Sequence, residues 1–156
     1  MTPGVDPKLL AAIRVLRAES NWAHVATVTP EGEPHVTPML LGVDEEHLYL
    51  SLTGQRKRRN LARRPLVAIS LARQADTAHV VVWGRVTERS DDWAQQRWER
   101  MIEDAGGTEL LEQLRRPLSD QGTVLGVVDV ERYRVYGVDD STPTDRDATE
   151  PRSDRR

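Results

Sequence analysis

Residues 22–43 read WAHVATVTPEGEPHVTPMLLGV, and this stretch decides the kind of fold. In 22–29 the sequence takes on a period of two, which is the spacing of a β-strand. The next four residues, PEGE, contain the proline and glycine that are typical of a turn. A second apolar stretch follows in 34–43. The segment therefore predicts a β-hairpin.

Further strands are expected on both sides of a basic segment. In 47–53, leucines at 48, 50 and 52 alternate with other residues, so this strand extends the hairpin into an antiparallel meander. Strands are also expected at 66–72 and 78–89, where Gly84 predicts either a bulge or the close approach of a ligand. The last part of the chain reads as two strands, 122–130 and 133–138, or as one bent strand.

Helices are expected around these strands. The first follows Asp6 and Pro7, a typical helix start, and runs to about residue 19. The second, 55–64, ends before Pro65 because a residue preceding proline is disfavoured in the helical region. A third begins at residue 90 and is expected to stop at Gly106-Gly107, with a shorter helical turn at 109–115.

This order of elements indicates an α+β protein. Five to seven short antiparallel strands avoid exposed edges best by closing into a small barrel. Residues 1–138 are expected to form the folded domain. Residues 139–156 contain ten charged residues and one alanine, so we expect a disordered charged tail.

Composition excludes several classes of protein. The 156 residues carry a net charge of -3, contain no cysteine, and have no apolar run long enough to span a membrane. The absence of cysteine excludes disulfides and thiol catalysis. The first residues lack the basic and then apolar order of a signal peptide, so a cytoplasmic location is expected.

The segment 55–64 has six positive charges and no negative one. Because the whole chain is acidic, this local concentration favours contact with an anion. Three interpretations are open: a solvated basic face, a nucleic-acid footprint, or a site for the phosphate of a small cofactor. Nucleic acid is the least favoured, because the chain is acidic overall and has no phenylalanine to stack on bases.

No catalytic motif stands out among the nucleophiles and histidines. The chain has no Gly-x-Ser-x-Gly sequence, and its four histidines are not at metal-ligand spacings. We therefore expect no metal site and identify no catalytic side chain. Trp83, next to Gly84, is a candidate for contact with a planar ring.

Three pieces in a fixed order carry a resemblance to a known family: PHVTPM at 34–39, YLSLT at 49–53, and RKRRNL at 56–61 before Pro65. Together they resemble the pyridoxamine 5'-phosphate oxidase-like split-barrel superfamily, in particular its flavin- and deazaflavin (coenzyme F420)-dependent oxidoreductases. The resemblance covers about residues 6–138 and implies a six-stranded antiparallel split β-barrel with peripheral helices. One departure is Arg64, where similar proteins commonly place an acid before the proline.

The resemblance also implies which residues bind the cofactor: Val36, Thr37, Pro38, Met39, Ser51, Leu52, Thr53, Gln55, Arg56, Lys57, Asn60 and Trp83. Residues 36–39 would lie against the ring and its side chain, and the later group would hold the phosphate. Asn60 would fix the helix that carries Lys57. Arg58 and Arg59 would reach the acidic tail of the deazaflavin.

The implied function is hydride transfer between a cofactor, F420 or alternatively FMN, and a small organic substrate. In such enzymes the cofactor supplies the chemistry, so a missing catalytic motif is expected. The implied assembly is a homodimer with the cofactor at the interface, where Trp83 borders the partner's site. The alternatives are a non-enzymatic split barrel that binds a flavin-like ligand, and a nucleic-acid binder that uses the basic helix.

Overall fold

The computed structural model describes residues 4–52, 54–119 and 124–138. The elements in chain order are α1 (Pro7–Arg17), β1 (Trp22–Val28), β2 (Pro34–Val43), β3 (Leu48–Ser51), α2 (Gln55–Arg63), β4 (Leu66–Ala72), β5 (His79–Arg89), α3 (Asp92–Ser119) and β6 (Leu125–Tyr136). The predicted hairpin is β1 and β2, and the basic segment is α2. The predicted tail lies outside the described residues.

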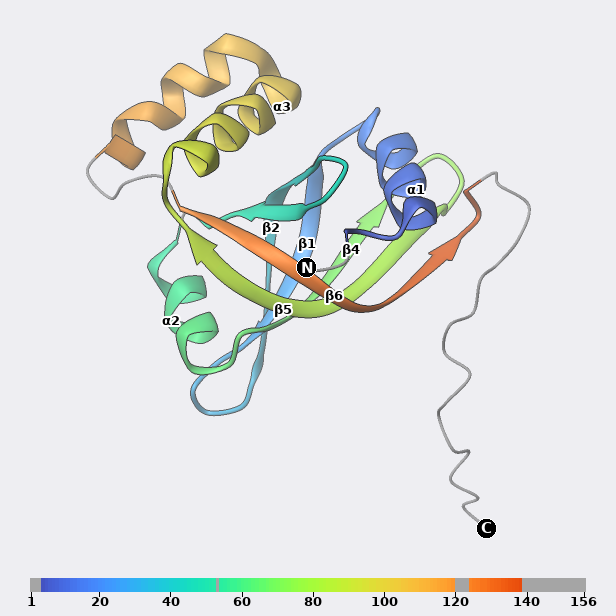
Figure 1. Ribbon diagram of the computed structural model, residues 1–156, viewed down its shortest axis with the longest axis horizontal. Helices are drawn as coiled ribbons and strands as arrows, with labels where there is room; N and C mark the ends of the chain where they lie inside the picture. The colour runs from blue at the N-terminus through green and yellow to red at the C-terminus, as the bar shows by residue number, and fades with distance from the viewer. Residues whose placement is uncertain (1–3, 53, 120–123, 139–156) are drawn as a thin grey trace.

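The six strands form a closed barrel in the order β1-β2-β3-β6-β5-β4 (Figure 1). All the recorded strand pairs are antiparallel. The predicted α+β fold with a six-stranded antiparallel barrel and peripheral helices is therefore confirmed. Within the described residues, no helix is both long and apolar enough to cross a membrane.

At the C-terminal side, the end of the third helix differs from the sequence prediction, and the final segment follows one of the two alternatives that the sequence left open. The glycines at 106 and 107 do not end the third helix, because α3 continues as one helix to Ser119. A helix-interior glycine costs only about 1 kcal/mol relative to alanine, so it weakens a helix without stopping it. The final segment is one strand, β6, of which the first four residues pair with β3 while the whole length pairs with β5.

The barrel interior is filled by aliphatic side chains and closed by two helices. Leu9, Ile13 and Leu16 of α1 are almost fully buried in this core, and α1 contacts β2, β4, β5 and β6. Leu61 of α2 joins the same core. Figure 1 shows α1 and α2 at opposite ends of the barrel.

Helix α3 packs on the outside of the barrel. Trp98, Met101 and Ile102 form a second apolar cluster with Leu40 and Leu125, and Tyr49 completes it. This cluster covers the outer face of the β2 C-terminal half. The N-terminal half of β2 is left outside this cover.

Gly84 marks a bulge between β5 and β6, which is one of the two alternatives predicted for this glycine. The register shifts between Trp83 and Gly84. A Cβ atom placed on Gly84 would lie 2.3 Å from the backbone oxygen of Asp129. The close neighbour is therefore the adjacent strand, and only a residue without a side chain allows the two backbones to approach.

We predict that Gly84→Ala lowers the free energy of unfolding by about 1 to 3 kcal/mol, because the backbone of β6 must move to accept the methyl group. Denaturant unfolding measures this change. Gly4→Ala is the control, since a Cβ there would have 3.7 Å to its nearest atoms. Equal stability of the two variants would contradict the proposed crowding.

Candidate functional site

Residues 34–40 of strand β2 have a neighbouring strand on only one side. This stretch pairs with β1, whereas β3 pairs only with Leu41–Val43. The cause is length, because β3 has four residues and β2 has ten. The stretch 34–40 therefore has an edge with no strand partner among the described residues.

The backbone groups on this edge follow from the ladder. Leu41 N–H donates to the Asn21 carbonyl and Thr29 N–H donates to the Glu33 carbonyl, each at 2.8 Å. In an antiparallel ladder the direction of these groups alternates along the strand, so residues 34, 36, 38 and 40 direct theirs away from β1. Positions 34 and 38 are prolines, which have no N–H to leave unpaired. Between them, Val36 offers both an N–H and a carbonyl to a ligand.

The side chains of this stretch point in alternate directions. Val36, 58% exposed, and Pro38 lie on the outer surface. Met39 is buried in the barrel core, and its N–H and carbonyl point toward β1, so at this edge it presents neither its side chain nor its backbone polar groups. Thr37 also points inward, and its Oγ1 is buried without a hydrogen-bond partner among the described residues.

His35 lies on the same inward face of β2 as Thr37. The sequence prediction did not include it among the site residues. It lies two residues before Thr37 on the same face of β2, and its Nδ1 is likewise buried with no partner in the described part of the chain. The period of two in the hairpin places residues 35 and 37 together, so the signal was present in the sequence. Two unsatisfied polar atoms at the open edge favour a polar ligand there.

The start of α2 is built to receive an anion. The helix begins after Gly54, which provides no capping side chain, and its first turn has no acidic residue. Its first recorded backbone bond runs from Arg58 N–H to the Gly54 carbonyl, at 3.2 Å. The three preceding N–H groups therefore lack partners within the helix and carry the positive end of its dipole.

Lys57 folds back over this helix start. A Cβ atom on Gly54 would lie 3.8 Å from Cε of Lys57, so the lysine stem covers the glycine. The side chain is half-buried, and burial lowers the pKa of Lys57 below its ordinary value of 10.5. No carboxylate among the described residues forms an ion pair with it. A bound anion would offset this loss of hydration.

Asn60 fixes α2 to the barrel. Its Nδ2 donates to Oγ1 of Thr27 at 2.9 Å, and both side chains are buried. Thr27 pairs with His35 across the β1–β2 ladder. This hydrogen bond, together with the packing of Leu61 in the core, sets the distance between the helix that carries Lys57 and the strand that carries the open edge.

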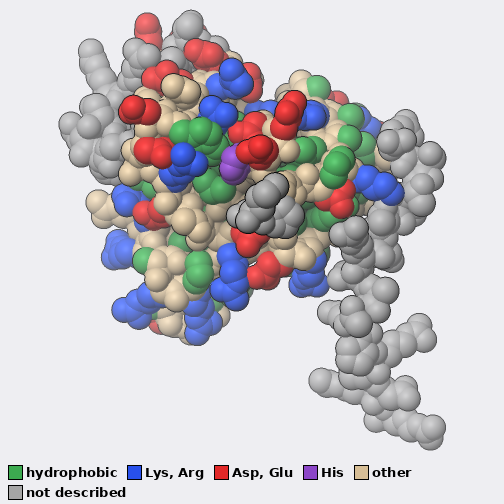
Figure 2. Space-filling view, viewed as in Figure 1, with side chains coloured by type: hydrophobic (Ala, Val, Ile, Leu, Met, Phe, Trp, Pro, Cys, Tyr) green, Lys and Arg blue, Asp and Glu red, His purple; other side chains and the backbone are tan. Residues whose placement is uncertain are grey.

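The other cations of α2 face solvent. Figure 2 shows Lys and Arg side chains gathered over the region of α2. Arg58 is bound to Glu88 of β5 through Nε–Oε1 at 3.1 Å and Nη2–Oε2 at 3.2 Å. This pair raises the pKa of Arg58. Arg56 and Arg59 are exposed, and no ion pair to either is present in the described residues.

The remaining predicted site residues differ in accessibility. Ser51 and Leu52 are buried, Leu52 belongs to the barrel core, and its N–H donates to the Val124 carbonyl at 3.0 Å. Gln55 is exposed at the start of α2. Thr53 lies outside the described residues. These positions border the start of α2 in sequence, and their part in cofactor binding stays a prediction.

Trp83 lies on the outer face of β5. The guanidinium of Arg132 lies 4.2 Å from the centre of its ring. The register aligns Trp83 with Ala68, Ala68 with Ala26, and Ala26 with Val36. The predicted role of Trp83 beside a partner's cofactor therefore depends on what covers this face.

The outer face of β2, β1, β4 and β5 is largely apolar. Trp22 is 45% exposed and Leu66 is 39% exposed, and both lie on this face with Val36. Pairing brings these strands side by side, so the exposed side chains form one surface. A contiguous exposed apolar surface usually marks a site of interaction with another molecule.

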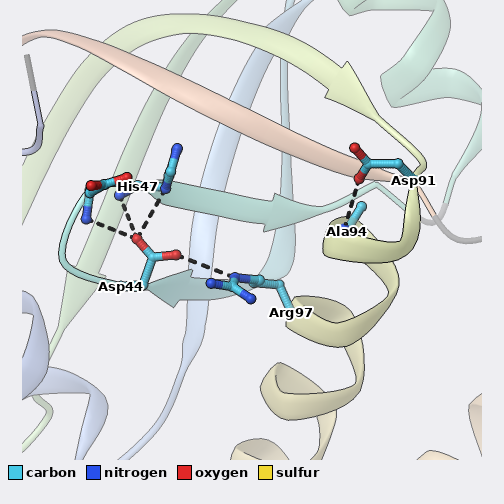
Figure 3. A network of polar contacts seen from close by, with 6 residues as sticks. Asp44, His47, Asp91, Ala94 and Arg97 are labelled. Carbon is cyan, nitrogen blue, oxygen red and sulfur yellow. Dashed lines mark hydrogen bonds and ion pairs between the residues drawn. The ribbon is translucent and has the colours of Figure 1, made fainter. Parts of the chain in front are cut away.

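A second polar network holds α3 and takes no part in the site (Figure 3). Asp44 accepts hydrogen bonds from the backbone and Nδ1 of His47, at 2.7 and 3.1 Å, and from Nε of Arg97 at 3.3 Å. Burial raises the pKa of Asp44, but its hydrogen bonds outweigh this effect and the pKa lies below its ordinary value. Asp91 caps α3 by accepting from Ala94 N–H at 3.0 Å. Across the described chain, no cluster of three metal-binding side chains occurs.

Comparison with known families decides the classification. A family model described as pyridoxamine 5'-phosphate oxidase matches residues 9–137. The chain belongs to this family. A comparison with curated protein sequences finds no match. The predicted resemblance is thereby confirmed at the level of the family.

Solved structures similar to this family member differ in their described roles. A protein named F420 reductase is 25% identical, with a TM-score of 0.62, over 77% of this chain and 94% of that chain. A putative pyridoxamine 5'-phosphate oxidase from Listeria innocua is 18% identical, with a TM-score of 0.62, over 84% and 97%. A heme-binding protein from Mycobacterium smegmatis is 21% identical, with a TM-score of 0.62, over 85% and 55%. The last two show the fold alone.

We predict that Asn60→Ala lowers the free energy of unfolding by about 1 to 3 kcal/mol, because Thr27 loses the donor of a buried hydrogen bond. Denaturant unfolding would measure the loss. Gln55→Ala, an exposed change on the same helix, serves as the control and should stay within about 0.5 kcal/mol of wild type. A loss no larger than that of the control would contradict an anchoring role for Asn60.

Proposed function

We propose that the chain binds coenzyme F420, or alternatively FMN, between the open edge of β2 and the start of α2. In this proposal it transfers a hydride between that cofactor and a small organic substrate. The main support for this proposal is the environment of Lys57. Lys57 is partly desolvated over an uncapped helix start and has no acidic partner in the described residues.

The residues at the site suit both ends of such a cofactor. The free N–H groups of α2 and the ammonium of Lys57 would hold a phosphate. Val36 N–H and the carbonyls of Pro34 and Pro38 would bind the polar edge of a flat ring. Thr37 Oγ1 and His35 Nδ1 would satisfy hydroxyl or ring atoms between the two ends.

The bound cofactor would accept or deliver the hydride, and the protein would position it. The hydrogen bond of Asn60 to Thr27 holds the phosphate end at a fixed distance from β2. Lys57 neutralises the phosphate charge. No general acid or base is required from the residues of this site.

The choice of F420 over FMN has two supports. One is the set of exposed arginines next to Lys57, which suits a cofactor with an acidic tail. The other is the likeness to the F420 reductase at 25% identity. A non-enzymatic ligand-binding role is the alternative from another class, and it would use the same residues without a substrate. A nucleic-acid role would use only the exposed arginines of α2.

Adding F420 and FMN separately to the purified protein, and following the fluorescence of each ligand, tests the proposal. Saturable binding of one identifies the cofactor. Binding of neither overturns the proposed oxidoreductase and also the flavin-like ligand-binding role. Oxidation or reduction of the bound cofactor by candidate substrates then separates the enzyme from the simple binder.

We predict that Lys57→Ala weakens cofactor binding by about 1.5 to 3 kcal/mol, the range for a hydrogen bond to a charged group. The stability of the fold should change little, because the lysine has no ion pair to lose among the described residues. Fluorescence titration measures the binding and thermal unfolding measures the stability. Arg63→Ala removes the same charge from the last turn of α2 and is the control. Unchanged affinity in Lys57→Ala would reject its phosphate role.

We also propose that a second copy of the chain covers the apolar face of β2, β1, β4 and β5. Val36 belongs both to this face and to the candidate cofactor site, so a partner here would enclose the ligand. A small barrel is filled by its own side chains, which favours a site between two copies. Trp83 of this face would then border the site of the partner.

We predict that Leu66→Lys shifts the protein toward monomer, because a charged group then enters the apolar face. Sedimentation at falling protein concentration, with and without cofactor, measures the shift. Val15→Lys is the matched control, since Val15 is 46% exposed on α1, away from this face. The same oligomeric state in both variants and wild type would place the interface elsewhere.

A further inference from the structure

Glu88 is the acid that faces the basic helix. Its carboxylate binds Arg58 through two hydrogen bonds, the paired geometry that guanidinium and carboxylate groups favour. Both side chains are over a third exposed, at 38% and 39%. The next residue, Arg89, is engaged elsewhere, because its Nε donates to Asp91 at 2.8 Å. Glu88 therefore pairs with Arg58 and not with its neighbour Arg89.

This pair is joined to α2 at the residue that follows Lys57 of the candidate anion site. Arg58 follows Lys57 in the first turn of α2, so the two cations are neighbours on the backbone. Lys57 turns back over the helix start, whereas Arg58 reaches across to β5. Among the cations of α2 that the structure describes, Arg58 has an acidic partner, and no ion pair to Arg56, Lys57, Arg59 or Arg63 is present.

The arrangement treats a ligand with one negative group differently from a ligand with several. A single phosphate needs only the helix start and Lys57, and it leaves the Glu88–Arg58 pair intact. A ligand with further negative groups meets a guanidinium that is already neutralised and a carboxylate that repels it.

We propose that Glu88 is a specificity-determining residue that disfavours ligands with several negative groups at this site. The inference rests on the proposed anion site at the start of α2. It concerns ligand choice: Glu88 favours a cofactor with one phosphate over one with a long acidic tail. The acidic tail of F420 would then have to use Arg56 or Arg59 in place of Arg58.

Titration with two inorganic anions, phosphate and tripolyphosphate, tests this without any cofactor. Calorimetry at low ionic strength is suitable, because salt screens exposed charges. Glu88→Gln keeps the size of the side chain and frees Arg58. It should tighten tripolyphosphate binding by about three- to fivefold, the upper range for one exposed ion pair. Phosphate binding should stay within about twofold of wild type.

Two further variants make the result specific to the pair. Asp104→Asn also removes one negative charge, from the pair of the exposed Asp104 with the largely buried Arg17 between α1 and α3, and should change neither affinity. Adding Arg58→Gln to Glu88→Gln should abolish the gain. Thermal unfolding of each variant checks that the fold is kept.

Equal gains in Glu88→Gln and Asp104→Asn would overturn the inference, because net charge alone would then explain them. Equal gains for both anions, or no binding of either anion to wild type and Glu88→Gln, would overturn it as well. The proposed function can be rejected while this inference stands. That is the outcome if neither F420 nor FMN binds but the preference between the two anions still changes as expected. The ratio of FMN to F420 affinity in Glu88→Gln should shift toward F420.

Discussion

The site depends on a mismatch in strand length within a closed barrel. Strand β2 is ten residues long and its neighbour β3 only four, so the barrel closes through the C-terminal part of β2 alone. The rest of β2 keeps its partner β1 and leaves its other edge open. Helix α2 follows β3 in the chain and therefore starts close to where this pairing stops. A strand edge and a helix start are brought together by one short strand.

The same arrangement concentrates unbalanced polar groups. Among the described residues, Lys57 loses hydration without gaining a carboxylate, and two side-chain atoms of β2 are buried without hydrogen-bond partners. Each of these is unfavourable in the free protein. The rest of the barrel compensates with a continuous aliphatic core and two helices that close its ends. Residues that destabilise the free chain and lie next to one another are typical of ligand sites.

Much of this fold could be predicted from the sequence, because the decisive signals are local. Turn residues separate the hairpin strands, and Pro65 marks the end of α2, so the observed bounds lie within a few residues of the expected ones. The glycines in α3 misled the prediction, since an interior glycine weakens a helix by only about 1 kcal/mol and does not stop it. Side-chain direction required the three-dimensional structure, which shows that Met39 and Leu52 lie in the core. The pair of Arg58 with Glu88 joins residues 30 positions apart, and no local pattern announces it.

The two prolines of β2 have a consequence for the solubility of the protein. An open strand edge is a template on which the strand of another chain can add, and such addition leads to aggregation. Pro34 and Pro38 remove two of the donors that an added strand would need, and they stand on either side of Val36. The edge can still bind a small molecule that requires one donor and a few acceptors. The spacing of the prolines thus leaves the edge open to a ligand while making it a poor template for another polypeptide.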